Sequence, residues 1–257
     1  MTADSLSINL THHFLIAMPS LEDETFAKSV VYVCEHSERG AMGLVINKPS
    51  DLSMAGLFEK VDLPLHRQDL MNAPVLQGGP VHTERGFVLH DALWSHELPQ
   101  VGEAAAVAAQ EHSREVDVTS EVAHEAAHKA VHKAVHKAAQ EKAAEAAQEA
   151  AALSAVSDKE SVYASTMTIP GGLEMTTSKD VLEALSIGAG PKRVLISLGY
   201  SAWGEGQLES ELAENSWLTV GADMAVIFDT PVEQRYERAM KLLGLEPWML
   251  SNEVGHS

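Results

Sequence analysis

The chain has 257 residues, 45% of them hydrophobic, so it is long enough to bury a substantial core. Its 37 acidic and 18 basic side chains give a formal charge of −19, which disfavours binding to nucleic-acid phosphates unless basic residues gather in one place. The single cysteine excludes an intramolecular disulfide and a cysteine-rich metal site.

The amino-terminal segment lacks the pattern of a targeting sequence. It has no basic stretch, and its apolar run FLIAMP is too short for a signal core or a membrane span. We therefore expect a cytoplasmic protein that does not associate with membranes.

Five short runs in the first 91 residues predict β-strands, because they are rich in Val, Ile, Leu and Phe and are bounded by Gly, Pro and polar residues. The close succession of SVVYVCEH and GLVINKP across SERGAM predicts a hairpin with antiparallel strands. The five runs are THHFLIAMP, SVVYVCEH, AMGLVINKP, APVLQGGP and RGFVLHD.

Two short helices are expected between these strands. The first covers residues 20 to 29, SLEDETFAKS, with acidic side chains in its first turn. The second covers SMAGLFEKV, residues 53 to 61.

The segment from 103 to 160 differs in composition from the rest, since 19 of the 50 residues from 103 to 152 are alanine. Strong helix formers predict a helix from about 121 to 152, but its few large apolar residues cannot form a docking face. We expect this low-complexity segment to protrude as a helix or to be disordered. Nine acidic and five basic residues lie in 103 to 152, so −4 of the −19 belongs there and −15 to the remainder.

After this segment the pattern predicts the order helix, strand, helix, strand, helix. Thr177 or Ser178 is expected to cap the first helix, with Asp180 in its first turn. PKRVLISLGY is the best candidate for an interior strand, and Thr230 to Glu233 combine a capping box with a helix-starting proline. Because strands gather early and helices late, the class predicted is α+β.

Five segments, in this order, resemble those of the YqgE/AlgH family of bacterial proteins. The match covers nearly all of residues 8 to 102 and 161 to 257. The segments are HHFLIAMPSLEDETFAKSVVYVCEHSERGAMGLVINKP, VLQGGPVHTERGFVLH, LEMTTSKDVLEAL, RVLISLGYSAWGEGQLESELAENSWLTV and FDTPVEQRYERAMKLLGL.

The resemblance implies a single discontinuous domain, made of residues 1–102 and 161–257, with residues 103–160 as an insertion. Its sheet is expected to be twisted, mainly antiparallel and barrel-like, with helices on its flanks. Relatives in this family have a short connection where this chain has the alanine-rich segment, so the insertion is expected to be a departure from the family.

The resemblance implies little about mechanism, because the family is largely uncharacterised; some members carry the label of transcriptional regulator through a link to exopolysaccharide gene expression. No helix-turn-helix with a basic face is found, and a charge of −15 weighs against direct contact with DNA. We expect a protein that binds a protein or small-molecule partner and affects gene expression indirectly. Direct transcriptional regulation is the disfavoured alternative, and no cofactor is expected.

Cys34 and His36 suggest a second alternative, a cysteine-dependent hydrolase or transferase. Residues two apart in a strand share a face, so an imidazolium at His36 could favour the thiolate of Cys34. The competing interpretation is that Cys34 is a small buried hydrophobic residue, which is the common environment of a free cysteine.

Two further segments are candidate ligand sites. The loop Gln77, Gly78, Gly79, Pro80 could present converging backbone N–H groups to an anion, although a tight turn explains it as well. The hydroxyl and N–H groups at Thr177 and Ser178 could bind a carboxylate or phosphate, although helix capping also explains them.

The glycine-rich segment LGYSAWGEGQLESEL lies between a predicted strand and a predicted helix, but it lacks the glycine spacing of nucleotide-binding loops. Glu205, Glu209 and Glu211 would also repel a phosphate. Trp203 and Trp217 are expected to anchor the core.

Four histidines recur every four residues in the alanine-rich segment, at positions 124, 128, 132 and 136. A neighbouring pair could hold a divalent ion, but it would supply only two ligands. We therefore expect no metal site.

Overall fold

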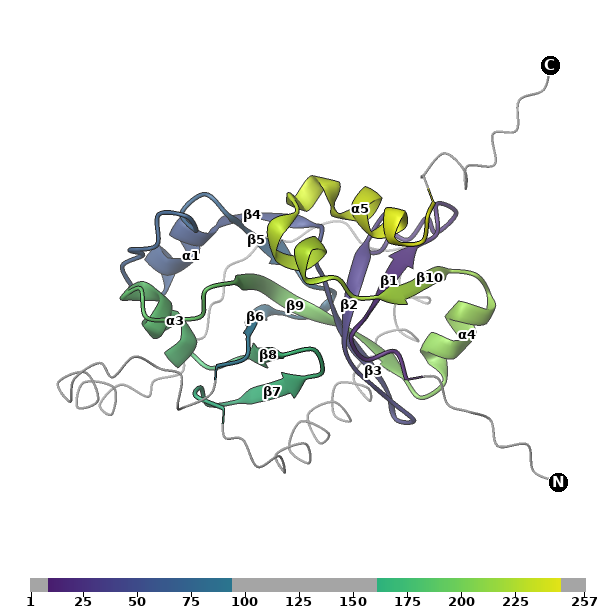
Figure 1. The fold of residues 1–257 in the computed structure, drawn as a ribbon, viewed down its shortest axis with the longest axis horizontal. Helices are drawn as coiled ribbons and strands as arrows, with labels where there is room; N and C mark the ends of the chain where they lie inside the picture. Colours follow the sequence, from purple (N-terminus) through teal and green to yellow (C-terminus); the bar gives the residue numbers. More distant parts are fainter. Residues whose placement is uncertain (1–8, 94–160, 246–257) are drawn as a thin grey trace, which may run out of the picture.

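The computed structural model describes residues 9–93 and 161–245, which form one curled sheet of ten strands with helices on its flanks (Figure 1). Its α+β class and its mainly antiparallel pairing are as predicted. The strands are β1 (His13–Ala17), β2 (Val30–Ser37), β3 (Gly40–Val45), β4 (Pro49–Ser53), β5 (Pro74–Gln77), β6 (Val81–Asp91), β7 (Thr166–Ile169), β8 (Leu173–Thr176), β9 (Val194–Gly204) and β10 (Trp217–Gly221).

The helical elements cover the sheet in three places, each over its own cluster of buried apolar side chains. One cluster lies under η1 and α5, a second under α4, and a third under α1 and α3. The elements are α1 (Met54–Lys60), α3 (Asp180–Ser186), α4 (Gln207–Ala213), the π-helical turn η1 (Ala225–Asp229), the 3-10 turn η2 (Val232–Gln234) and α5 (Arg235–Leu242).

Strand β9 is the centre of the sheet. It pairs with β3 and β6 in antiparallel directions and with β5 in a parallel direction. The sheet order is β10-β1-β2-β3-β9-β6-β8-β7, with β4 and β5 off this path. The prediction that PKRVLISLGY contains an interior strand is confirmed.

The hairpin of β2 and β3 is also confirmed, but its register shifts at one point. Val33 lies opposite Gly43, whereas Glu35 lies opposite Met42, so Cys34 is an extra residue in β2. Such a β-bulge interrupts the alternation of side chains between the two faces of a strand.

The helix predicted for residues 20 to 29 is wrong, because these residues form turns. The Oδ1 atom of Asp23 accepts hydrogen bonds from the N–H groups of Thr25 and Phe26, at 2.8 and 3.0 Å. An aspartate side chain that binds nearby backbone N–H groups offers the chain an alternative to a continuous helix. The helix predicted for SMAGLFEKV is confirmed as α1, whose N-cap Ser53 accepts from the N–H of Gly56.

Both predicted helix caps in the second half are wrong. The N-cap of α3 is Lys179, which makes no side-chain capping bond, while the N–H of Thr177 donates to the carbonyl of Ser165. The Thr230 hydroxyl donates to the carbonyl of Ala225 at 2.8 Å, and the helical chain begins with η2 rather than with an α-helical first turn.

The hairpin of β7 and β8 was not predicted. These strands have four residues each, too few for a clear pattern of alternation, and they are joined through Gly171 and Gly172, both at positive φ. The helix predicted from about 121 to 152 and its four histidines lie outside the described residues. Within residues 9–93 and 161–245, no helix has the length and apolarity needed to cross a membrane.

Candidate functional site

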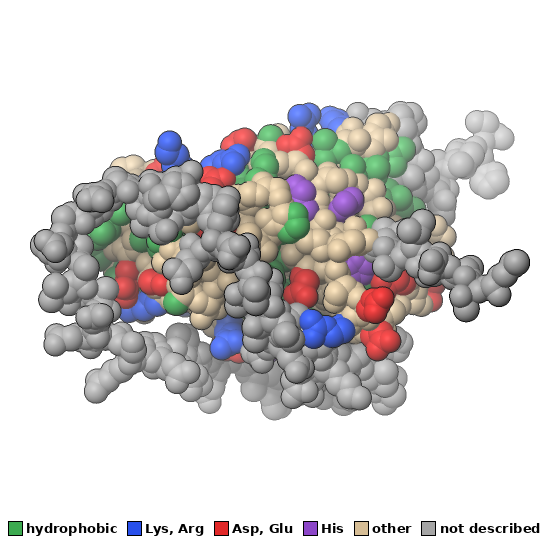
Figure 2. All heavy atoms as spheres, turned by 60° about the horizontal axis from the view of Figure 1, so that its bottom comes forward, with side chains coloured by type: hydrophobic (Ala, Val, Ile, Leu, Met, Phe, Trp, Pro, Cys, Tyr) green, Lys and Arg blue, Asp and Glu red, His purple; other side chains and the backbone are tan. Residues whose placement is uncertain are grey.

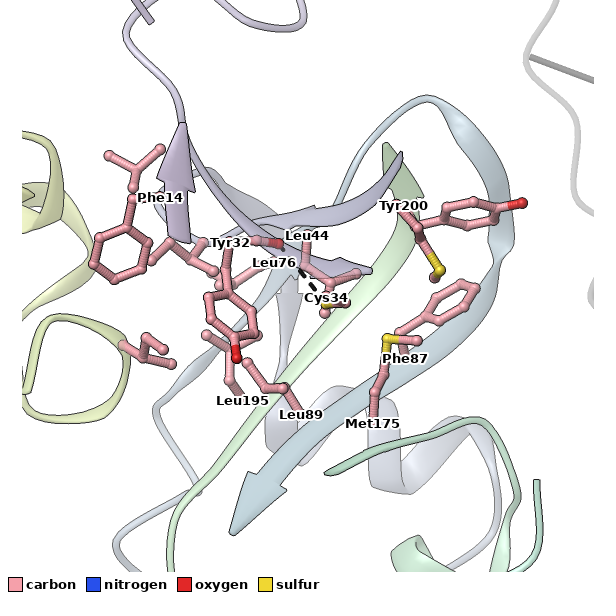
Figure 3. Close-up of a cluster of buried hydrophobic side chains, with 14 of the residues drawn as sticks. Phe14, Tyr32, Cys34, Leu44, Leu76, Phe87, Leu89, Met175, Leu195 and Tyr200 are labelled. Carbon is pink, nitrogen blue, oxygen red and sulfur yellow. Dashed lines mark hydrogen bonds between the residues drawn. The ribbon is translucent and has the colours of Figure 1, made fainter. Parts of the chain in front are cut away.

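Cys34 lies in the largest apolar cluster, with only 2% of its surface exposed (Figure 3). Its sulfur is 3.7 Å from the carbonyl oxygen of Tyr32, and the side chains around it include Leu44 and Leu89. Burial raises the pKa of the Cys34 thiol, and the neighbouring charge of Glu35 raises it further. The thiol is therefore held in its protonated and unreactive form.

His36 lies on the opposite face of the sheet, because the bulge at Cys34 changes the alternation along β2. Its Nδ1 accepts a hydrogen bond from the N–H of Leu10 at 2.9 Å, so its Nε2 carries the proton and donates to Glu209 Oε1 at 2.9 Å. Glu209 belongs to α4. The structure does not bring Cys34 and His36 together.

The loop Gln77 to Pro80 packs closely against β9. The N–H of Gly78 donates to the carbonyl of Leu198, and the carbonyl of Gly78 accepts from the N–H of Val45, both at 2.8 Å. A Cβ atom on Gly78 would lie 2.2 Å from the carbonyl oxygen of Gly199. These glycines therefore allow two backbone segments to cross, and the N–H of Gly78 already has a partner.

Thr177 and Ser178 precede α3, and no contact in the described residues joins them to the other predicted site residues. The Thr177 hydroxyl is 3.5 Å from the carbonyl of Ser165, the same atom that accepts from the Thr177 N–H. Because α3 has only seven residues and no side-chain cap, its first turn is a poor binding site for a carboxylate or phosphate.

Trp203 and Trp217 are buried as predicted, and their rings meet edge to face at 6.0 Å. The two indole N–H groups donate to the same atom, Glu211 Oε2, at 2.9 and 2.7 Å. Glu211 also accepts from Gln207, so this glutamate of α4 connects two tryptophans from different strands. Its role in the described structure is to join α4 to the sheet.

A cleft of about 270 Å³ lies at the start of β9, where the sequence alone indicated no site. Its walls come from the first residue of α1, the α1–β5 connection, β5, the start of β9 with the two residues before it, η1, η2 and the first residue of α5. The lining residues are Met54, Arg67, Asp69, Leu70, Ala73, Pro74, Leu76, Lys192, Arg193, Val194, Leu195, Ile196, Phe228, Val232 and Arg235.

Four of the lining side chains are cationic, and one is acidic. This concentration of positive charge is unexpected in a chain of formal charge −19. The four cations come from three segments that are far apart in sequence, at Arg67, at Lys192 and Arg193, and at Arg235. Folding therefore creates a local basic environment in an acidic protein.

Two of these arginines have acidic partners. Arg67 binds Asp69 through Nε and Nη2, at 2.8 and 2.6 Å, and also donates to the carbonyls of Pro191 and Lys192, which positions the chain entering β9. Arg193 binds Asp91 at 2.6 Å, and its guanidinium lies 5.1 Å from the centre of the Phe228 ring.

Arg235 differs from both, because its hydrogen bonds go to uncharged groups. It is 7% exposed, and it donates to the carbonyls of Thr230 and Ile46 at 3.0 and 2.5 Å. Burial lowers its pKa to about 10, opposed by the negative charge of the exposed Glu233. Arg235 therefore remains protonated at neutral pH and presents a largely desolvated positive charge beside the cleft.

Comparison with known proteins gives consistent results for sequence and for fold. A family model described as AlgH-like (DUF179) matches residues 14–147 and 146–248. UPF0301 proteins of Paracidovorax citrulli (strain AAC00-1) and Variovorax paradoxus (strain S110) are 62% and 58% identical over the whole of both chains. The solution structure of the AlgH protein from Pseudomonas aeruginosa is 36% identical, covers both chains completely and has a TM-score of 0.58.

A second solved structure supports the fold alone. The crystal structure of a protein from Corynebacterium diphtheriae is 16% identical, covers 98% of this chain and 100% of its own, and has a TM-score of 0.56. The alignments with the two UPF0301 relatives run over 258 and 257 positions, so both have a similar length. The expected departure from the family at residues 103 to 152 therefore does not apply to these relatives.

Proposed function

The chain belongs to the AlgH-like family, and we propose that it is a binding protein whose ligand is an anion held in the cleft at the start of β9. The observation that carries this proposal is the buried Arg235 guanidinium, which has only carbonyl oxygens as partners among the described residues. An anion in the cleft would compensate this charge, as acidic side chains do for Arg67 and Arg193.

We propose further that an effect on gene expression is indirect and follows from ligand binding or from contact with a partner protein. The lack of a broad basic surface on the face shown in Figure 2 supports this part of the proposal. On the face shown in Figure 2, the described Lys and Arg side chains are interspersed with acidic side chains and do not form a continuous basic surface. A cytoplasmic location belongs to the same proposal, because the single cysteine has no partner for a disulfide.

The cysteine-dependent reaction remains a weaker alternative, which no contact in the described residues favours. Cys34 has a buried thiol with a raised pKa, and His36 is hydrogen bonded to Leu10 and Glu209. A thiol nucleophile needs access to its substrate and a group that stabilises the thiolate.

Calorimetric titration of the full chain with inorganic phosphate, sulfate and acetate, at constant ionic strength set by chloride, tests the proposal. We expect at least one of these anions to bind and to raise the thermal midpoint. The substitution Lys192→Gln removes an exposed cation of the cleft and should weaken binding by about fivefold or more, since charge-assisted contacts contribute on the order of 1 to 3 kcal/mol.

Arg39→Gln is the matched control, because Arg39 is an exposed cation in the β2–β3 turn and does not line the cleft. This variant should bind the anions as the native chain does. If no anion binds, or if both variants lose affinity equally, the cleft is not the binding site.

A further inference from the structure

We infer that the ligand of this cleft is a small phosphate monoester, bound as a dianion with its phosphate at Arg235 and Lys192. This inference rests on the proposed function and specifies the chemistry of the ligand. It depends on the charges that remain without acidic partners, on the donors of Arg235, and on the size and lining of the cleft.

Two of the four cations in the cleft have acidic partners among the described residues and two do not. Of the four cations, Arg67 and Arg193 are bound to Asp69 and Asp91. Within the described part of the chain, neither Lys192 nor Arg235 forms an ion pair or a hydrogen bond with a carboxylate. Two positive charges therefore remain uncompensated.

Other acidic groups lie near the cleft without lining it. Asp229 acts on Arg193, and Glu233 acts on Arg235, but both carboxylates are exposed. Water and salt screen an exposed charge far more than a buried one. A ligand inside the cleft would be the closer counterion for Arg235.

The guanidinium of Arg235 is held in one orientation by two hydrogen bonds. Nε and Nη1 of Arg235 each donate to a carbonyl oxygen, so these contacts fix its plane. The Nη2 group makes no hydrogen bond to the described residues, and the Arg235 side chain lines the cleft. A fixed guanidinium with unused donors suits an anion that has several acceptor oxygens.

A phosphate monoester satisfies these requirements better than a carboxylate does. It carries about −1.5 to −2 charge at pH 7 and three strong acceptor oxygens. A carboxylate carries a single charge, so one of the two cations would remain uncompensated. The dianion therefore matches Lys192 and Arg235 together.

The volume of the cleft limits the size of its ligand. At about 270 Å³, the cleft lies just below the range of roughly 300–1,000 Å³ for the pockets of drug-sized ligands. Its apolar wall includes Leu76, Ile196, Phe228 and Val232. The body of the ligand should therefore be small and partly apolar, which excludes a dinucleotide or a polymer as the bound group.

Phenyl phosphate and benzoate, titrated separately into the full chain at pH 7.5, provide the test. They share an apolar ring and differ in charge and in the number of acceptor oxygens. We expect phenyl phosphate to bind at least about tenfold more tightly. Equal affinity for the two probes would overturn the phosphate assignment and leave anion binding intact, whereas binding of neither would remove both.

The dependence on pH gives an independent readout. The second pKa of a phosphate monoester is about 6, so the affinity for phenyl phosphate should fall about tenfold between pH 7.5 and pH 5. Among the described residues, the charged groups that line the cleft are Arg67, Asp69, Lys192, Arg193 and Arg235, and no histidine lines it. A pH-independent affinity for phenyl phosphate would show that the monoanion binds equally well, contrary to the inference.

Variants complete the test. Arg235→Gln should reduce the affinity for phenyl phosphate by tenfold or more, and Lys192→Gln should reduce it more than it reduces the affinity for benzoate. Arg235 is buried, so its variant could fail to fold; Lys192 is exposed, and its variant keeps the test decisive. Unchanged phenyl phosphate binding in Lys192→Gln would overturn the assignment of Lys192 and Arg235 as a joint phosphate site.

Discussion

Arg235 occupies an unfavourable position for a cation, because an unpaired charge loses hydration when it is buried. Its partners, the carbonyls of Thr230 and Ile46, carry only partial negative charge. Arg193 is more exposed and has a full carboxylate partner, whose hydrogen bond raises its pKa. The contrast between these two arginines identifies Arg235 as the residue that an anionic ligand would stabilise most.

At the scale of single residues, Cys34 should be almost inert in the folded protein. Its sulfur is buried and its pKa is raised, so both access and thiolate are lacking. Iodoacetamide should modify native Cys34 at least about a hundredfold more slowly than the chain unfolded in guanidinium at the same pH. His36→Gln should leave the native rate unchanged; rapid native modification with a midpoint below ~8.5 would instead favour the cysteine enzyme.

The buried carboxyl group of Glu174 leads to a second prediction for a single residue. It is fully buried, its Oε1 has no hydrogen-bond partner among the described residues, and burial raises its pKa. For an acid with a raised folded-state pKa, the stabilising contribution is present below the unfolded-state pKa and is lost as the pH rises through the folded-state value. Glu174→Gln should therefore raise the thermal midpoint by a few degrees at pH 7.5, with the gain disappearing near pH 4.

The control for Glu174 is Glu59→Gln, at an exposed position of α1. Thermal unfolding of both variants from pH 4 to 8 should show a pH-dependent difference only for Glu174→Gln. A Glu174→Gln variant that is less stable than the native chain at every pH would contradict the explanation by burial.

At the scale of elements, the crossing of the Gln77–Pro80 loop over β9 decides how the two halves of the chain join. Gly199 has a φ of 69°, and a Cβ atom on it would lie 2.5 Å from the carbonyl oxygen of Gly79. Positive φ and close backbone approach both require glycine there. The same strand begins beside the cleft, directly after Lys192 and Arg193.

Gly78→Ala should disrupt this crossing. Its new methyl group would meet the backbone oxygen of Gly199, which cannot move without shifting β9. We expect a loss of about 3 kcal/mol in the free energy of unfolding, or failure to fold. Gly86→Ala is the control, because a Cβ atom there meets no atom within 4 Å, and urea unfolding should show a change of about 0.5 kcal/mol or less.

A Gly78→Ala variant as stable as the native chain would show that the loop can move away from β9, and the ligand interpretation of the loop would regain support.

The bulge in β2 acts at the same scale. It places Cys34 and His36 on opposite faces of the sheet, although their spacing suggested a shared face. Cys34 packs in an apolar cluster, whereas His36 is hydrogen bonded to Glu209 of α4.

At the scale of the whole molecule, the described residues from both sides of the alanine-rich segment build one sheet. β6 from the first part pairs with β8 and β9 from the second. The N–H of Leu93 lies 3.5 Å from Glu174 Oε2, so the chain leaving β6 stays close to β8. Three apolar clusters draw on both parts, which indicates that the described residues contain their own core.

Deleting residues 103 to 152 and joining the ends by a short Gly/Ser linker should therefore leave the thermal midpoint within a few degrees of the native value. The entropic cost of closing a surface loop grows only slowly with the length of the loop. Circular dichroism during heating measures this midpoint. Aggregation of the shortened chain, or a much lower midpoint, would show that the segment packs against the sheet.

Residues 30 to 49 and 191 to 200 belong to the candidate sites, but their sequence predicted only that they form β-strands. The signal for the cleft was weak, since Lys192 and Arg193 form a short basic pair and Arg235 lies within an ordinary helical pattern. None of these residues has an unusual neighbour in sequence. Their proximity to Arg67 depends on strand pairing and on the path of the chain into α5.

The sequence by itself determined the family, the α+β class, the β2–β3 hairpin, α1 and the central strand, because these depend on apolar periodicity and turn residues that act over a few positions. Only the tertiary structure decided that a bulge separates Cys34 from His36, that Gly78 serves a backbone crossing, and that Arg235 is buried. Each of these properties depends on atoms contributed by distant segments. The charge of the cleft and the burial of Arg235 therefore follow from the tertiary structure and not from the local sequence.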